Sequence, residues 1–168
     1  MRLIALFVIL VAATVVACGG SPTGPGSSGS LRVMLKDSPF TEAKSLLVTF
    51  SEVSVHKADE AADSWKKLAF SGSASSRTCD LMKLRTAQDV LGVGAIDTGH
   101  YTQIRLMVTS STIHFDNAAA GNACDTTIAA PSGRSAPLEI PSGEVKLNRE
   151  FDVSSNNTTS ILLDFDGD

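Results

Sequence analysis

The sequence lacks dense clusters of positive charge, which limits the partners it can have. No more than two Lys or Arg residues are adjacent anywhere in its 168 residues, and the formal net charge is −4. Proteins that bind nucleic acid carry basic patches that neutralise phosphates. We therefore expect no nucleic-acid partner and no peripheral, polybasic contact with a membrane.

Two common catalytic signatures are also missing. The chain has neither a Gly-x-Ser-x-Gly elbow nor a His-Glu-x-x-His pair, so the hydrolases that depend on these motifs are excluded. We expect a non-enzymatic structural, adhesion or ligand-binding module that needs no cofactor. A divalent-cation or carbohydrate-binding module stays open as an alternative, as does a hydrolase whose site is assembled from unrelated loops.

No apolar run reaches the length of about twenty residues that a transmembrane helix needs. The run from Leu3 to Val16 follows Arg2 and has the length and charge of an export signal. The four residues Val15 to Cys18 resemble a bacterial lipobox, which implies cleavage after Ala17 and acylation of Cys18. Gly19 follows in place of an Asp retention signal, which favours the outer membrane. A plain signal peptide with a chance Cys, or a buried N-terminal strand, remains the alternative.

The next segment contains neither charge nor apolar side chains. Gly19 to Ser30 consists only of Gly, Ser, Pro and Thr, and such a segment cannot bury enough surface to order itself. The expected organisation is therefore a signal peptide (1–17), a lipidated Cys with a flexible tether (18–30) and one folded domain (31–168). The membrane, reached through the lipid, is the expected partner, and a protein or glycan partner is left unspecified.

With Cys18 acylated, only Cys79 and Cys124 remain. An even pair in an oxidising envelope compartment is typical of a disulfide. Two separate buried thiols or a metal-binding pair are the alternatives, although no Cys-x-x-Cys spacing supports a metal.

Alternating apolar residues between turn signals predict about eight short strands, and hence a mainly β, antiparallel, Greek-key-like β-sandwich. The alternating sets include Leu31/Val33/Leu35, Leu46/Val48/Phe50, Val53/Val55, Leu68/Phe70, Ile104/Leu106/Val108, Ile113/Phe115, Leu138/Ile140, Val145/Leu147/Phe151/Val153 and Ile161/Leu163/Phe165. The change of parity at Ser51-Glu52 predicts a β-bulge. Asp80 to Leu91 is the one predicted helix, with Asp80 as its cap and Gly92 as its end.

Six segments together resemble a known family. They are Lys36-Asp37-Ser38-Pro39, Val53-Ser54-Val55-His56 followed by Trp65, Asp80-Leu81-Met82-Lys83-Leu84, Gly99 to Leu106, Ile140-Pro141-Ser142-Gly143, and Leu163-Asp164-Phe165-Asp166. This pattern is similar to the bacterial lipoprotein family catalogued as domain of unknown function 4382, over nearly all of Leu31 to Asp166. The resemblance implies an envelope-anchored, mostly β domain. It implies no activity and supplies no site residues.

Asp164, Asp166 and Asp168 form the first candidate site. Period-2 geometry would place their carboxylates on one strand face, about 7 Å apart. Ca²⁺ favours such oxygen ligands and is the one cofactor considered. A solvated strand face is the alternative.

Tyr101, Gln103 and Arg105 form the second candidate site. They share one parity, opposite Ile104, so we predict an outward-facing surface, joined by Trp65, that could bind a sugar or a peptide. A bare or packed sheet face is the alternative. His56, His100 and His114 lack metal-ligand spacing, and we expect them at the surface.

Overall fold

A computed structural model describes residues 28–38, 42–85 and 88–166 of the chain. The predicted signal peptide, Cys18, most of the predicted tether and Asp168 lie outside these residues. The described strands are β1 (Ser28–Ser38), β2 (Ser45–Lys57), β3 (Lys66–Phe70), β4 (Arg77–Asp80), β5 (Asp89–Asp97), β6 (Gly99–His114), β7 (Cys124–Asp125), β8 (Ser135–Pro137), β9 (Glu144–Val153) and β10 (Thr158–Asp166). Two short 3-10 helices, η1 (Ser71–Ser73) and η2 (Leu81–Arg85), complete the described elements.

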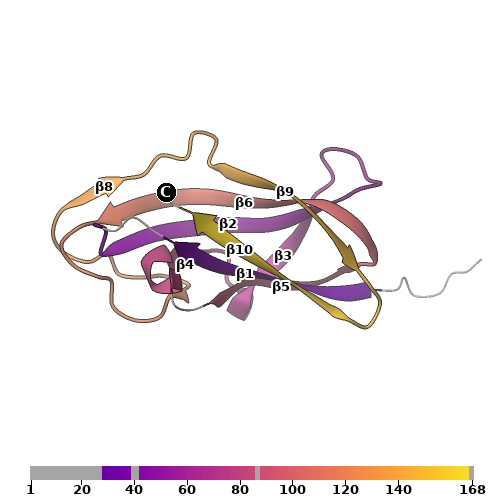
Figure 1. The fold of residues 1–168 in the computed structure, drawn as a ribbon, viewed down its shortest axis with the longest axis horizontal. Coiled ribbons are helices and arrows are strands. Elements are labelled where there is room, and N and C mark those ends of the chain that lie inside the picture. The colour runs from indigo at the N-terminus through magenta and orange to yellow at the C-terminus, as the bar shows by residue number, and fades with distance from the viewer. Residues whose placement is uncertain (1–27, 39–41, 86–87, 167–168) are drawn as a thin grey trace, which may run out of the picture.

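The strands form two layers, as the sequence predicts for a sandwich (Figure 1). Sheet A has the order β10-β1-β5-β3, and sheet B consists of β2 with β3 and β4 on one side and β6 on the other, extended by β7, β8 and β9. Strand β3 belongs to both sheets, because its first residues pair with β2 and its last two pair with β5. The two layers are therefore one continuous hydrogen-bonded surface that folds over at β3.

One strand pair departs from the expected antiparallel arrangement. β9 pairs with β6 in sheet B, whereas β10 pairs with β1 in sheet A. The turn at Asn156 has a positive φ of 59°, and it carries the chain from one sheet to the other instead of forming a hairpin. As a result, β10 runs parallel to β1, and the sandwich is mixed.

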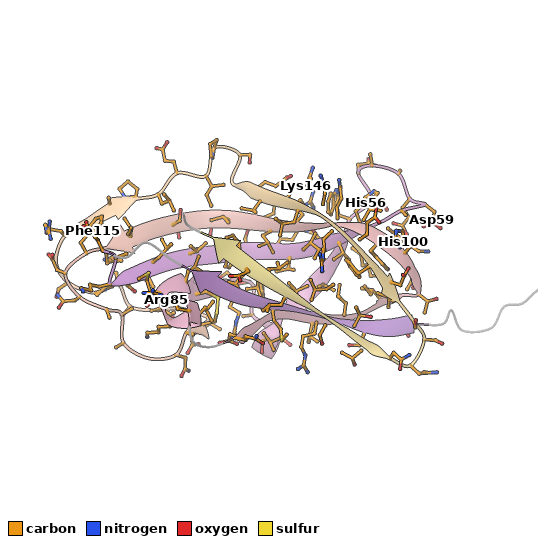
Figure 2. All side chains as sticks on the ribbon, in the orientation of Figure 1. His56, Asp59, Arg85, His100, Phe115 and Lys146 are labelled. Atoms are coloured by element: carbon orange, nitrogen blue, oxygen red, sulfur yellow. A yellow bond between two sulfur atoms is a disulfide. The ribbon has the colours of Figure 1, made fainter. Side chains whose placement is uncertain are left out.

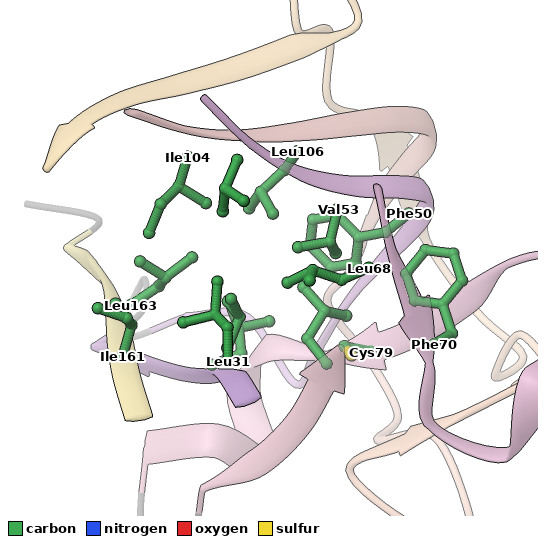
Figure 3. Close-up of a cluster of buried hydrophobic side chains, with 14 of the residues drawn as sticks. Leu31, Phe50, Val53, Leu68, Phe70, Cys79, Ile104, Leu106, Ile161 and Leu163 are labelled. Carbon is green, nitrogen blue, oxygen red and sulfur yellow. The ribbon is translucent and has the colours of Figure 1, made fainter. Parts of the chain in front are cut away.

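The core lies between the sheets and is built from the alternating residues that predicted the strands (Figure 3). Leu31, Val33 and Leu35 of β1 have no exposed surface, and neither do Ile104 and Leu106 of β6. Burying one such side chain contributes about 1.5–3 kcal/mol. This interdigitation is what fixes the register of both sheets.

The bulge predicted in β2 is confirmed. Phe50 pairs with Val108, and the next pair is Glu52 with Met107, so Ser51 is unpaired. Because one residue is inserted, Phe50 and Val53 both face the core. Glu52 consequently points to the outer face of sheet B.

The helix predicted from Asp80 to Leu91 is wrong. Asp80 ends β4, only the single turn η2 follows, and β5 begins at Asp89. The Asp80 carboxylate is fully buried, and it accepts hydrogen bonds from the Leu46 backbone N–H at 3.0 Å and the Met82 N–H at 3.2 Å. Asp80 thus caps one turn, while Leu91 is drawn into the core.

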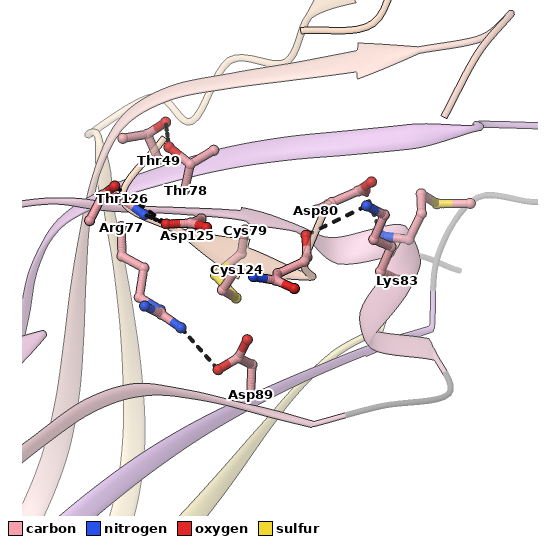
Figure 4. The surroundings of a disulfide bond; sticks show 12 residues. Thr49, Arg77, Thr78, Cys79, Asp80, Lys83, Asp89, Cys124, Asp125 and Thr126 are labelled. Atoms are coloured by element: carbon pink, nitrogen blue, oxygen red, sulfur yellow. Dashed lines mark hydrogen bonds and ion pairs between the residues drawn. A yellow bond between two sulfur atoms is a disulfide. The ribbon is translucent and has the colours of Figure 1, made fainter. Parts of the chain in front are cut away.

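The two cysteines are joined (Figure 4), with an S–S distance of 2.09 Å. The bond links β4 to β7, a two-residue strand within the loop between β6 and β8. Nearby, Arg77 of β4 forms an ion pair with Asp89 of β5 at 3.0 Å. The disulfide thus fastens the loop to sheet B, and the ion pair fastens sheet B to sheet A at the same end.

Two boundaries differ from the predicted ones. β1 begins at Ser28, three residues inside the expected tether, because Ser28 and Gly29 already pair with Asp97 and Ile96 of β5. Gly29 also lies so close to Val153 and Ser154 that a Cβ there would collide with both. The strand expected at Leu138 and Ile140 is found instead at Ser135–Pro137.

Candidate functional site

A cleft opens where the sandwich ends beside the β2–β3 connection. We name it the Trp65 cleft, and it encloses about 230 Å³. Sites for drug-sized ligands occupy about 300–1,000 Å³, so this cleft has room for one small group. Its lining residues are Lys57, Glu60, Ser64, Trp65, Lys66, Asp97 and Tyr101.

The cleft contains the only tryptophan and the only tyrosine of the chain. Tyr101 is 2% exposed and stacks on Phe151, with ring centroids 5.3 Å apart. Its hydroxyl donates to the Asp97 carbonyl at 2.8 Å. Burial, with the negative charges of Asp97, Glu60 and Asp59, raises the pKa of Tyr101 to about 12. The hydroxyl therefore stays protonated, as a hydrogen-bonding group at the floor of the cleft.

This position of Tyr101 corrects the predicted outward surface. The β6–β9 register shifts between Tyr101 and Gln103, so the parity counted from the sequence reverses there. Tyr101 turns into the core, whereas Gln103 stays outside and donates to Asn148 at 2.9 Å. The structure does not bring the three predicted residues together on one face.

Three side chains pack around the indole ring of Trp65, and Figure 2 labels two of them, His56 and Lys146. The guanidinium carbon of Arg105 lies 4.3 Å from the ring centroid, and the Lys146 ammonium lies 5.4 Å from it. The His56 ring packs at 5.3 Å with a tilt of 58°. Each cation over an indole contributes about 0.5–2 kcal/mol. The contact between Trp65 and Arg105 agrees with the predicted grouping of these two residues.

The guanidinium of Arg105 is in turn held in place by the Glu52 carboxylate. It donates to the Glu52 carboxylate at 2.7 Å and to the Ser54 hydroxyl at 3.2 Å, and Lys67 reaches the same carboxylate at 2.5 Å. Burial alone would raise the pKa of Glu52, but hydrogen bonds from Lys67, Arg105 and Ser54 together hold it below its ordinary value. A network of charged side chains on the outer face of sheet B therefore holds Arg105 in place against Trp65, which lines the cleft.

The β2–β3 connection that forms the rim is tied down by hydrogen bonds. Ala58 N–H donates to the His100 carbonyl at 2.9 Å, and His56 Nε2 donates to the Ala61 carbonyl at 2.9 Å. Ser64 Oγ donates to Glu60 at 2.7 Å. These contacts, with the braced Trp65, make the cleft a preformed feature of the fold.

Two of the three histidines expected at the surface are buried. His56 is 9% exposed and His114 is 4% exposed, whereas His100 lies at the surface and pairs with Asp152 at 2.9 Å. The expectation is therefore wrong for His56, which has a positioning role at the cleft. It is also wrong for His114, which lies at the far end of β6.

The acidic candidate site is only partly described. Asp164 is exposed on β10, in register with Lys36 of β1. The side chain of Asp166 and all of Asp168 lie outside the described residues. No group of three or more His, Cys, Asp or Glu side chains within residues 28–38, 42–85 and 88–166 is arranged to hold a metal. Calcium binding at this end of the chain stays a prediction.

Comparison with known proteins identifies the family of this fold. A family model described as "Domain of unknown function (DUF4382)" matches residues 28–168. The chain belongs to this family. No curated protein matches the chain. Among the described residues, no helix is long and apolar enough to span a membrane.

One solved structure shows a weak similarity, a leucine-rich repeat protein from Bacteroides thetaiotaomicron VPI-5482. It has 12% sequence identity and a TM-score of 0.29, and the match covers 86% of this chain. The match spans only 15% of that protein.

Most of the cleft was missed by sequence reasoning. Lys57, Glu60, Ser64, Lys66 and Asp97 come from segments that no motif connects. The one available signal is compositional, because the chain has a single Trp and a single Tyr. Both belong to segments on which the family resemblance rests.

Proposed function

We propose that this chain is a non-enzymatic binding module of the bacterial cell envelope, anchored through acylated Cys18, that holds a sugar residue in the Trp65 cleft. The observation that carries the proposal is that the only Trp and the only Tyr of the chain line one small cleft. A sugar ring presents an apolar face of C–H groups and a rim of hydroxyls. An indole beside hydrogen-bonding groups complements both.

The charges of the cleft favour an uncharged ligand. Two basic residues, Lys57 and Lys66, line it together with two acidic residues, Glu60 and Asp97. Because these charges balance, the lining offers both donors and acceptors without attracting ions of one sign. This pattern suits the alternating hydroxyls of a neutral sugar.

The state of the cleft's hydroxyl groups favours binding rather than catalysis. With its pKa raised to about 12, Tyr101 stays in its protonated form at neutral pH. The Ser64 hydroxyl is engaged with Glu60 at 2.7 Å and helps to shape the rim. Neither group is poised as an acid, a base or a nucleophile, so the proposal assigns the cleft no reaction.

The sole Trp makes the proposal directly testable. We expect neutral mono- and disaccharides, titrated into the full chain, to change the Trp65 fluorescence in a saturable way. Tyr101→Phe removes one hydroxyl but keeps the stack on Phe151. Because one hydrogen bond contributes about 1 kcal/mol, this change should weaken binding about fivefold. Phe115→Ala is the matched control, because Phe115 lies at the opposite end of the sandwich (Figure 2).

Calorimetry supplies the second readout. Trp65→Ala should abolish the heat of binding, whereas Phe115→Ala should leave it unchanged. A panel of neutral sugars that produces neither a fluorescence change nor heat at millimolar concentration would rule out this ligand class.

A further inference from the structure

The exposed strand edges of the sandwich are not alike. Three of them carry the features by which proteins block edge-to-edge pairing. β7 has two residues, and β8 has three, of which the last is Pro137. β9 is longer, but its register against β6 is interrupted opposite Thr102, and it carries Lys146, Arg149 and Glu150. These edges are poor templates for another strand.

β10 lacks those features. It has nine residues and is paired on one side only, with β1, in a register without interruption. Its first six residues, 158–163, include no charge and no proline. In an edge strand, every other residue directs its backbone N–H and C=O outward. β10 is thus a long edge strand with an uninterrupted register.

The outer face beside this edge is apolar. Leu162 of β10 is 42% exposed, and it lies in register with Met34 of β1, which in turn pairs with Val90 of β5. Val93, the next outward apolar residue of β5, is 37% exposed. An apolar row therefore crosses three strands and ends at the open edge.

We propose that β10 pairs antiparallel with β10 of a second copy of this chain, about a two-fold axis at Leu162. The axis stands perpendicular to sheet A, so the two apolar rows meet at the paired Leu162 side chains. Sheet A then becomes one sheet that runs through both copies, as closed two-fold symmetry allows. None of the residues that line the Trp65 cleft lies on β1 or β10, and this inference does not depend on the proposed function.

The sequence of β10 is complementary to itself in this register. With Leu162 opposite Leu162, Ser160 lies opposite Asp164 of the second copy, and Thr158 lies opposite Asp166. Hydroxyl-bearing residues at one end of the strand therefore lie opposite acidic residues at the other end. A parallel copy would set Asp164 against Asp164, and like charges directly opposite each other are destabilising. This charge pattern favours β10 of a second copy, in the antiparallel orientation, as the strand that pairs with the β10 edge.

The test is a cross-link in cells that express the full chain. We expect Leu162→Cys to give a disulfide-linked dimer on a non-reducing gel. Leu138→Cys is the matched control, because Leu138 is 39% exposed and lies outside sheet A, and it should remain monomeric. No dimer band from Leu162→Cys, or a band with a different protein in its place, would overturn the proposal.

Two further measurements test the proposal. The first checks the register of the paired strands, and the second detects the dimer without relying on a disulfide. Chains with Ser160→Cys and Asp164→Cys, carrying different tags and expressed together, should cross-link to each other. Self-linking of Ser160→Cys alone would contradict the antiparallel pairing. Light scattering on the purified full chain should show a dimer for the wild type and for Leu138→Lys, and a monomer for Leu162→Lys. A monomeric wild type across the micromolar range would also refute the proposal.

Discussion

Removal of the Cys79–Cys124 disulfide should destabilise the domain by an amount that loop length predicts. The sequence separation of 45 closes a loop of 46 residues, counting both cysteines. In the chain-entropy model, a loop of this size contributes about 4 kcal/mol to the free energy of unfolding. For a domain of this size, that loss corresponds to a fall in Tm of about 10–15 °C.

The assay is urea unfolding of the Cys79→Ala/Cys124→Ala double variant, followed by Trp65 fluorescence. Both sulfurs are buried, so the variant also loses packing contacts, and the reduced wild type is the control that separates the two effects. We expect the reduced wild type to lose most of the 4 kcal/mol. A loss below about 1 kcal/mol would show that the loop is already constrained in the unfolded chain. Two free thiols in the denatured, unreduced protein would refute the pairing itself.

Three other predictions test separate parts of the structure. Glu52 has a pKa below its ordinary value when folded, so its contribution to stability is present above the unfolded pKa of about 4.5 and is lost as the pH falls through the folded value. Glu52→Gln should therefore reduce the loss of unfolding free energy as the pH falls from about 5 to about 3. An unchanged dependence of the unfolding free energy on pH would disprove this role. Asp80→Asn, which loses a buried charge that accepts several hydrogen bonds, should cost about 2–3 kcal/mol in urea unfolding, whereas a neutral result would mean that the amide satisfies the same donors. Cys18→Ser should abolish metabolic labelling with palmitate and release the chain from the membrane fraction. Retained labelling would disprove lipidation at this residue.

The alternation of apolar residues was sufficient to predict the sandwich and most of its strands. Leu31 to Leu35 and Ile104 to Leu106 alternate because one face of each strand is buried. The bulge at Ser51 could be predicted as well, because it interrupts a pattern that is regular on both sides.

The bulge next to Tyr101 could not be predicted in this way. No apolar pattern precedes Tyr101 within β6, so the sequence gives no sign of the reversal, and the residue was assigned to the wrong face. The predicted helix failed for a related reason. Asp80 has the composition of a helix cap, but its carboxylate is satisfied by Leu46, from a strand more than thirty residues away. Local signals cannot show a partner at that distance.

The cleft was even harder to predict from the sequence, because it is assembled from the ends of β2 and β5, the starts of β3 and β6, and the β2–β3 connection. No spacing in the sequence links Glu60 to Asp97. Only the tertiary packing that braces Trp65 with Arg105 brings these segments together.

The parallel pairing of β1 with β10 has a mechanical consequence. The chain enters β1 at Ser28 and leaves β10 at Asp166, and these points lie at opposite ends of the pair. Tension applied between the two ends of the domain therefore acts along both strands and loads all nine residue pairs from Ser30–Thr158 to Ser38–Asp166 in shear. The backbone hydrogen bonds must then yield together rather than one after another. The first and last strands thus act as a clamp that resists stretching of the domain.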